Sequence, residues 1–233
     1  LKHCSLMVPS GSRLTGMRRT AFLVALIAIA ALAGGHVAGQ DAASSAANES
    51  TRKPWVRWWW PGSAVDRLNL TRQLEELARV GIGGVEITPI YGARGYEERY
   101  LRFLTPEFMA MLEHAGREAR RLGMAVDMAT GTGWPFGGPW IASDNAAARM
   151  VLRHGKLAGE ATGMMVKRAA PGGEGLVVNP FSPDALRAYL SPFDAAFAAF
   201  PRGVIRAQFH DSFEYAAASW APGPPAVFRE MHR

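Results

Sequence analysis

The sequence predicts an α/β fold in which short buried strands alternate with amphipathic helices. Apolar segments of strand length occur at residues 56–60, 84–87, 124–128 and 203–209. Between the first two segments, leucines recur at helical spacing and share one helix face: Leu70, Leu74 and Leu77. Strands that alternate with helices indicate parallel βα units. Because βα crossovers are right-handed, we expect the helices to lie on one outer side of the sheet.

Two further helices are predicted from their start signals. Thr105-Pro106-Glu107 combines a capping residue with proline at the first helical position, and an apolar stripe then runs to Gly123. Ser182-Pro183-Asp184 is a start of the same kind, for a helix that reaches Phe200 with interruptions. Residues 151–178 have a different pattern, which predicts a short β insertion of two or three antiparallel strands.

Two architectures accommodate this order of elements, a (β/α)8 TIM barrel and an open doubly wound sheet. A barrel has eight strands and typically about 250 residues, whereas this chain of 233 residues shows four candidate core strands. We interpret residues 54–233 as the truncated N-terminal part of a (β/α)8 domain, with about the first four βα units.

The first 40 residues have the pattern of a secretory signal peptide. Arg18 and Arg19 precede an apolar run from Ala21 to Ala33, and small residues follow it. The run is shorter than the roughly 20 apolar residues that a membrane-spanning helix needs. We therefore expect residues 1–40 to be upstream and signal sequence, and the mature protein to be secreted or periplasmic and free of the membrane. Residues 41–53 are small and polar, and we expect a flexible linker there.

The basic character of the chain is concentrated in this leader. The formal net charge is +6 and the pI is about 9.9, values typical of nucleic-acid-binding proteins. Four basic residues and no acidic ones lie in the first 40 positions, so the rest holds 22 basic and 20 acidic residues. That balance argues against a nucleic-acid partner. The single cysteine, Cys4, precedes the signal region, so we expect a mature chain without disulfides or thiolate metal sites.

Aromatic and acidic residues follow the ends of the predicted strands. In a barrel, such positions form the functional rim. The candidates for contact with a substrate are Trp58, Trp59, Trp60, Glu86, Asp127, Trp134, Phe136, Trp140, His210, Asp211 and Glu214. Aromatic rings stack on the C–H faces of sugars, and glycosidases use a pair of carboxylic acids. The residue types therefore predict a carbohydrate site.

The sequence leaves several roles within this rim open. Neighbouring side chains in a strand point to opposite faces, so some rings of Trp58–Trp60 should fill the wall while at least one faces the sugar. Glu86 lies in a buried strand, where it either pairs with an arginine inside the barrel or reaches the site. Of Asp211 and Glu214, at least one should point into the rim. The loop Gly131–Gly138 lacks the glycine spacing of a phosphate-binding loop.

Several of these segments together resemble glycoside hydrolase family 106, the α-L-rhamnosidases. The similar motifs, in order along the chain, are RWWWPG (57–62), GIGGVEI (81–87), VDMATGTGWPFGGPW (126–140), VVNPFS (177–182) and HDSFEY (210–215). The resemblance implies a secreted bacterial enzyme that hydrolyses terminal α-L-rhamnosidic bonds of plant polysaccharides or glycosides. It also implies inversion, a calcium ion whose ligands are not assigned, and Glu214 as the catalytic acid. The catalytic base would lie beyond Arg233.

Two other functions are compatible with the same rim. One is a non-catalytic carbohydrate-binding protein on a decayed or truncated barrel, in which aromatic residues are kept and carboxylates are lost. The other is an interaction module that binds a protein through the tryptophan cluster. The presence of Glu86, Asp127, Asp211 and Glu214 favours the enzyme.

We predict that these 233 residues alone are inactive and fold poorly, whereas the full-length protein hydrolyses rhamnosides. An inverting hydrolase needs two carboxylates around a positioned water, and a half barrel leaves exposed sheet edges that promote aggregation. The test is the release of nitrophenol from a nitrophenyl α-L-rhamnoside. Robust release by the isolated fragment would contradict the prediction.

Overall fold

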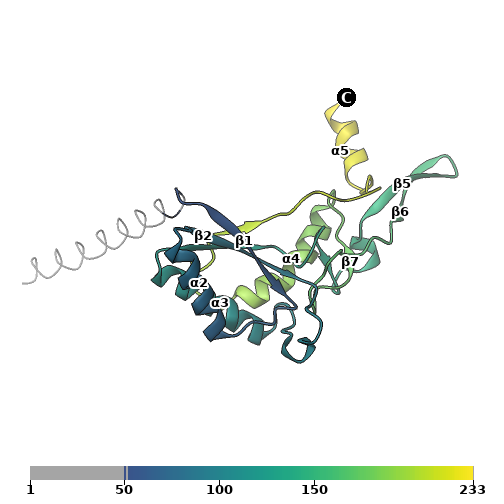
Figure 1. The fold of residues 1–233 in the computed structure, drawn as a ribbon. Coiled ribbons are helices and arrows are strands. Elements are labelled where there is room, and N and C mark those ends of the chain that lie inside the picture. The colour runs from purple at the N-terminus through teal and green to yellow at the C-terminus, as the bar shows by residue number, and fades with distance from the viewer. Residues whose placement is uncertain (1–49, 51, 233) are drawn as a thin grey trace, which may run out of the picture. The chain divides into compact units, whose positions relative to one another are not determined.

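The structure is a computed structural model that describes Ser50 and residues 52–232. Its main sheet contains four parallel strands in the order β1 (Trp55–Pro61), β2 (Gly84–Ile90), β3 (Ala125–Ala129) and β8 (Ala207–Phe209) (Figure 1). The predicted parallel α/β fold is thereby confirmed, whereas closure into a barrel stays a prediction. The predicted signal peptide and most of the linker lie outside the described residues. No helix of the described part is long and apolar enough to span a membrane.

Two helices cover one face of this sheet (Figure 1). Helix α2 (Arg67–Arg79) begins at Asp66, whose side chain accepts a hydrogen bond from the Asn69 amide at 2.9 Å. Helix α3 (Pro106–Arg121) is capped by Thr105, as its start signal predicts. Side chain–amide caps satisfy amides that the first helical turn leaves unpaired.

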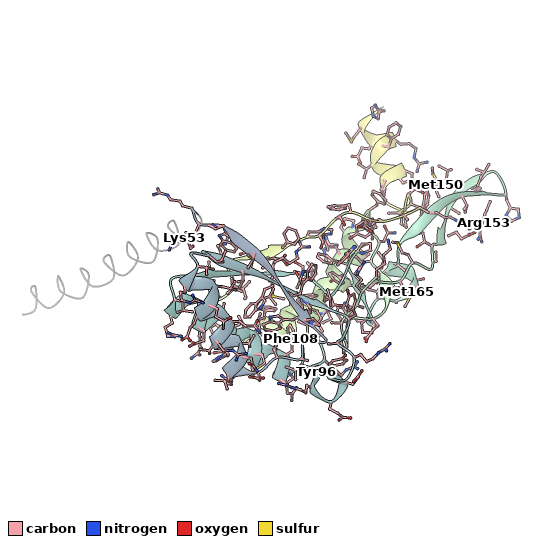
Figure 2. The ribbon with its side chains drawn as sticks, viewed as in Figure 1. Lys53, Tyr96, Phe108, Met150, Arg153 and Met165 are labelled. Carbon is pink, nitrogen blue, oxygen red and sulfur yellow. The ribbon has the colours of Figure 1, made fainter. Side chains whose placement is uncertain are left out.

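The covered face forms the hydrophobic core. Alternate strand residues point into it, and they meet apolar side chains of α2 and α3 such as Leu70, Leu74 and Phe108. Phe108, labelled in Figure 2, points from α3 toward the sheet and contacts the Trp60 ring at a centroid distance of 6.0 Å. The strand residues of this core are Trp58, Trp60, Val85, Ile87, Val126 and Met128.

The opposite face of the sheet is polar. The Cα positions of Arg57, Glu86 and Asp127 are direct partners across β1, β2 and β3, so their side chains share one face. Parallel sheets normally bury apolar side chains on both faces. Here the second face carries the charged side chains of Arg57, Glu86 and Asp127 instead. This indicates that the polar face forms a functional site.

The predicted β insertion contains a hairpin and one further short strand, which pairs with a strand that precedes the predicted range. Strands β5 (Ala148–Arg153) and β6 (Lys156–Ala161) form a hairpin, in which Met150 and Arg153 are labelled in Figure 2. Its turn residues, His154 and Gly155, have φ angles of 50° and 73°, the sign that a tight two-residue hairpin requires. The second pair joins β4 (Gly137–Gly138) to β7 (Leu176–Val177). The other elements are η1 (Glu97–Arg99), η2 (Ser143–Asn145), α4 (Pro183–Phe197) and α5 (Pro224–Met231).

The fourth core strand is shorter than the sequence predicts. A strand was expected over residues 203–209, but β8 begins at Ala207. The backbone turns at Gly203, where φ is 72°, and Val204 is then buried against Gly116 of α3. A side chain at Gly116 would lie 2.1 Å from Val204 Cγ1, so the apolar character of this segment reflects contact with the helix.

We predict that Trp60 supports the fold more than its neighbour Trp59. The Trp60 side chain is 1% exposed, so Trp60→Ala should lower the free energy of unfolding by about 3–5 kcal/mol through the cavity it leaves. Trp60 Nε1 has no hydrogen-bond partner among the described residues, so Trp60→Phe removes an unpaired buried donor and should cost only about 1 kcal/mol. Calorimetry of the full-length protein measures both changes.

The exposed Trp59→Ala is the matched control, with an expected loss below about 1 kcal/mol. Equal destabilisation by Trp59→Ala and Trp60→Ala would contradict the assignment of the two rings.

Candidate functional site

The tryptophan run divides between the two faces of the sheet. Trp58 and Trp60 are 9% and 1% exposed and point into the helix-covered core, whereas Trp59 points to the polar face and is 41% exposed. The rings of Trp58 and Trp60 contact each other edge to face, with their centroids 5.7 Å apart. This geometry is typical of aromatic side chains packed in a core. The expectation of substrate contacts at Trp58 and Trp60 is thus corrected, and Trp59 is the ring available to a ligand.

Trp59 meets Trp134, which follows the end of β3. Their ring centroids are 6.3 Å apart, and the planes are inclined at 42°. Trp134 is held by a two-way backbone pairing with Lys167, through N–H···O distances of 3.1 and 3.0 Å. Gly133 permits this pairing because a side chain there would lie 2.0 Å from the Lys167 carbonyl oxygen. The two rings form an aromatic platform on the polar side of the sheet.

The pairing with Trp134 also brings two cations of the insertion to the platform. The Arg168 guanidinium lies over the Trp134 ring at 5.2 Å and over Tyr91 at 5.7 Å. The Lys167 ammonium bonds to a carboxylate oxygen of Glu214 at 3.1 Å. A segment remote from the strands in sequence therefore completes one side of the site.

Phe136 and Trp140 belong mainly to the packing of α4. Phe136 is 4% exposed and stacks on Tyr189, while Trp140 stacks on the same ring and donates a hydrogen bond to the Tyr189 carbonyl oxygen at 3.1 Å. The expectation that Trp140 also shapes the sugar pocket stays a prediction. Phe136 still lines a cavity of about 380 Å³, together with His210 and Phe213. Burial also raises the pKa of Tyr189 well above its usual range.

His210 lies among aromatic rings next to the predicted acids. Its ring centroid is 4.3 Å from that of Phe136 and 4.3 Å from that of Phe213, and its Nε2 is 3.2 Å from the Tyr215 hydroxyl. The adjacent Asp211 turns the other way, toward β1. Their opposite orientations do not form a His–Asp metal pair.

Three of the four predicted carboxylates are bound by arginine. Arg57 donates hydrogen bonds to Glu86 at 2.6 Å and to Asp211 at 2.9 Å. Arg206 donates one hydrogen bond to each carboxylate oxygen of Asp127. Glu86 thus pairs with an arginine and also lies on the polar face. The exposed fraction of the side chain is 12% for Glu86, 18% for Asp211 and 14% for Asp127.

Glu214 differs from these three in exposure and in partners. Its side chain is 45% exposed and accepts hydrogen bonds from the Ser212 hydroxyl at 2.8 Å and from Lys167. The Ser212 hydroxyl, followed by the Lys167 ammonium, lowers the pKa of Glu214 below the usual value of a glutamate. A hydroxyl and an exposed flexible ammonium exchange readily with water or with a ligand, unlike a forked guanidinium.

The described residues show no cluster of acidic side chains of the kind that calcium prefers. Calcium takes six to eight oxygen ligands, with carboxylates prominent among them. Within residues 52–232, no group of three or more His, Cys, Asp or Glu side chains is arranged to hold a metal ion. Arg57 and Arg206 also occupy carboxylate oxygens of the polar face. No chemical step is therefore assigned to a metal here.

Several residues of the site were missed at the level of sequence. Arg57 stands in the quoted RWWWPG motif, and strand alternation from Trp59 would have placed it on the polar face. Phe209, whose ring lies under the Arg57 guanidinium at 4.8 Å, follows the same logic on β8. Tyr91 directly follows β2, so its place after a strand end was a usable signal. Lys167 and Arg168 gave no usable signal, because their positions depend on how the insertion folds back.

A comparison with known protein families matches residues 46–162 to glycoside hydrolase family 106, described as alpha-L-rhamnosidase. The match covers half of the chain. The protein belongs to this α-L-rhamnosidase family. The family resemblance of the sequence motifs is therefore confirmed, and the polar face is the candidate glycosidase site of a family member.

Two known proteins are similar to parts of this rhamnosidase-family chain. A protein of Formosa agariphila (strain DSM 15362 / KCTC 12365 / LMG 23005 / KMM 3901 / M-2Alg 35-1) named "Putative beta-glucuronidase" is 25% identical over 109 residues, which cover 46% of this chain and 9% of that protein. The solved structure of the rhamnosidase from Novosphingobium sp. PP1Y is 27% identical, covers 43% of this chain and 10% of that one, and has a TM-score of 0.37. The similar region spans about a tenth of either relative.

We predict that the pKa of Glu214 in this rhamnosidase-family protein rises when its donors are removed. Ser212→Ala and Lys167→Met each remove a contact that favours the charged carboxylate, and the larger change is expected for Ser212→Ala. Because the pKa of Glu214 is lower in the folded state than in the unfolded state, these contacts stabilise the folded protein at neutral pH. This contribution disappears as the pH falls through the lowered pKa of Glu214. Titration of the Glu214 carboxyl carbon by NMR measures the shift.

Glu160 on the β5–β6 hairpin provides an internal control, because its pKa is lowered by Arg153 and Arg149 instead. Its titration should be unchanged in both variants. An unshifted or lowered Glu214 titration would show that the two donors do not set its protonation.

Proposed function

We propose that the full-length protein hydrolyses terminal α-L-rhamnosidic bonds in plant glycosides or polysaccharides, with inversion and with Glu214 as the catalytic acid. One observation carries the assignment of the acid. Of the four predicted carboxylates, Glu214 is the one held by an exposed lysine and a hydroxyl, whereas arginine binds Glu86, Asp127 and Asp211. A proton donor must reach the glycosidic oxygen, and Glu214 is the accessible one.

The aromatic platform supplies the complementary part of the proposal. Trp59 and Trp134 offer ring faces near the arginines and Glu214, suited to the apolar face of a deoxy sugar such as rhamnose. The polar groups of Arg168 and Lys167 flank these rings and can bind hydroxyls. The proposed partner is therefore a rhamnose-containing oligo- or polysaccharide.

In the proposed reaction, Glu214 donates its proton to the leaving oxygen as the bond to the sugar breaks. A second carboxylate takes a proton from the water that attacks the opposite face, at the wider separation that inversion requires, roughly 6.5–9.5 Å. We place this base beyond residue 233. Sugar stacked over Trp59 and Trp134 excludes water from Glu214, and desolvation raises a carboxyl pKa, which opposes the effect of Ser212 and Lys167.

The cellular setting is part of the same proposal. Residues 1–40 direct export, so the enzyme acts in the periplasm or outside the cell, where plant polymers are accessible. The calcium ion implied by the family resemblance stays part of the proposal, with its ligands unassigned.

We predict that Glu214→Gln abolishes acid catalysis in the full-length enzyme. Turnover of an alkyl or phenyl rhamnoside should fall by about 10²–10⁴-fold, because a poor leaving group needs protonation. A dinitrophenyl rhamnoside leaves without a proton, so its turnover should fall much less. Steady-state kinetics with both substrates measure the difference.

Glu160→Gln makes the same chemical change at a partly exposed glutamate of the hairpin that is also paired with cations. It should retain the kcat of the unaltered enzyme on both substrates. Near-normal turnover of the poorly activated rhamnoside by Glu214→Gln would show that the acid is another residue.

A further inference from the structure

We propose that Arg57 is the positioning residue for Glu214, acting through Asp211 and Ser212. The inference rests on the proposed function, in which Glu214 is the acid, and adds a residue that holds this acid in place. Arg57 lies on β1 at one edge of the sheet, whereas Asp211 follows β8 at the other edge. Their ion pair therefore links the first strand to the loop that carries Glu214.

The Arg57 guanidinium is held by two carboxylates and two aromatic rings. It donates from Nε to Glu86 at 2.6 Å and from Nη1 to Asp211 at 2.9 Å. The rings of Trp59 and Phe209 lie 5.2 and 4.8 Å from its central carbon. A planar fork between two rings and two carboxylates has little freedom to turn, so it can orient Asp211.

A continuous series of hydrogen bonds leads from Asp211 to Glu214. The second oxygen of Asp211 accepts from the backbone amide of Ser212 at 2.7 Å. The Ser212 hydroxyl then donates to Glu214 at 2.8 Å, and the Glu214 amide donates to the Ser212 carbonyl oxygen at 2.9 Å. Arg57 thus orients the Asp211 carboxylate, and Asp211 holds the backbone at Ser212. Ser212 in turn orients the carboxylate of Glu214.

The loop needs such a connection because the sheet supports it weakly. Strand β8 has three residues, all exposed, and residues 210–215 belong to no helix or strand. The lysine on the other side of Glu214 is itself 53% exposed. The side chains of Arg57 and Asp211 are 30% and 18% exposed, so their ion pair is better shielded from solvent.

The charges explain why loss of Arg57 should move the loop. Without the guanidinium, Glu86 and Asp211 would be two carboxylates facing one another across the space it occupied, and like charges repel. A lysine at position 57 would restore one positive charge but cannot make the fork that holds both carboxylates at once. Arg57→Lys should therefore recover part of the function lost in Arg57→Met.

The test compares leaving groups in the full-length enzyme. Arg57→Met is expected to lower kcat on a phenyl rhamnoside by about 10- to 100-fold through a misplaced acid, with a change below about threefold on a dinitrophenyl rhamnoside. KM should change little, and Arg57→Lys should lie between. Asp211→Asn breaks the same link from the loop side and should give the same leaving-group dependence. It serves in place of Arg57→Met if that variant does not fold.

Arg206→Met is the matched control, because Arg206 also pairs with a carboxylate of the polar face and lies over a tryptophan ring, Trp55. Any decrease in kcat caused by Arg206→Met should be the same on the phenyl and the dinitrophenyl rhamnoside. Equal losses on both substrates in Arg57→Met and Asp211→Asn would overturn the positioning role and leave an ion pair that only stabilises the fold. Glu214→Gln, measured alongside, separates the two proposals: if it lacks leaving-group dependence, the acid assignment fails first.

Discussion

The alternation of side chains along three registered parallel strands determines most of this structure. Trp58 and Trp60 point into the core, whereas Arg57 and Trp59 point to the opposite face. The register of the strands places Arg57 beside Glu86, and Glu86 beside Asp127, on that opposite face. The apolar half of the alternation stabilises the sheet against α2 and α3. The other half collects charges and exposed rings, so the core and the candidate site are two sides of one pattern.

The strands and helices could be predicted from local patterns, whereas the assignment of single rings could not. Leucine spacing and Thr105-Pro106 located α2 and α3, and apolar runs located β1 to β3. The run Trp58–Trp60 did not reveal which ring faces a ligand, because a shift by one residue exchanges the faces. That choice depends on pairing with β2, which is a contact between distant parts of the chain.

The limits of the sequence are clearest in the insertion and in the acidic residues. Lys167 and Arg168 reach the site because the chain returns along Trp134, and Gly133 leaves room for that approach. Neither residue stands near a strand end in the sequence. The sequence does not distinguish the four carboxylates, and their partners separate Glu214 from Glu86, Asp127 and Asp211.

The division of β1 between a core face and a ligand face also constrains how this segment can change during evolution. Substitutions at Trp59 or Arg57 alter one face and leave the other in place. Deletion of a single residue between Val56 and Pro61 would instead exchange the two faces along part of the strand, so that a residue of the ligand face enters the core and a core indole faces solvent. The length of this strand should therefore be more strictly maintained among descendants of the gene than the identity of the residues on its ligand face.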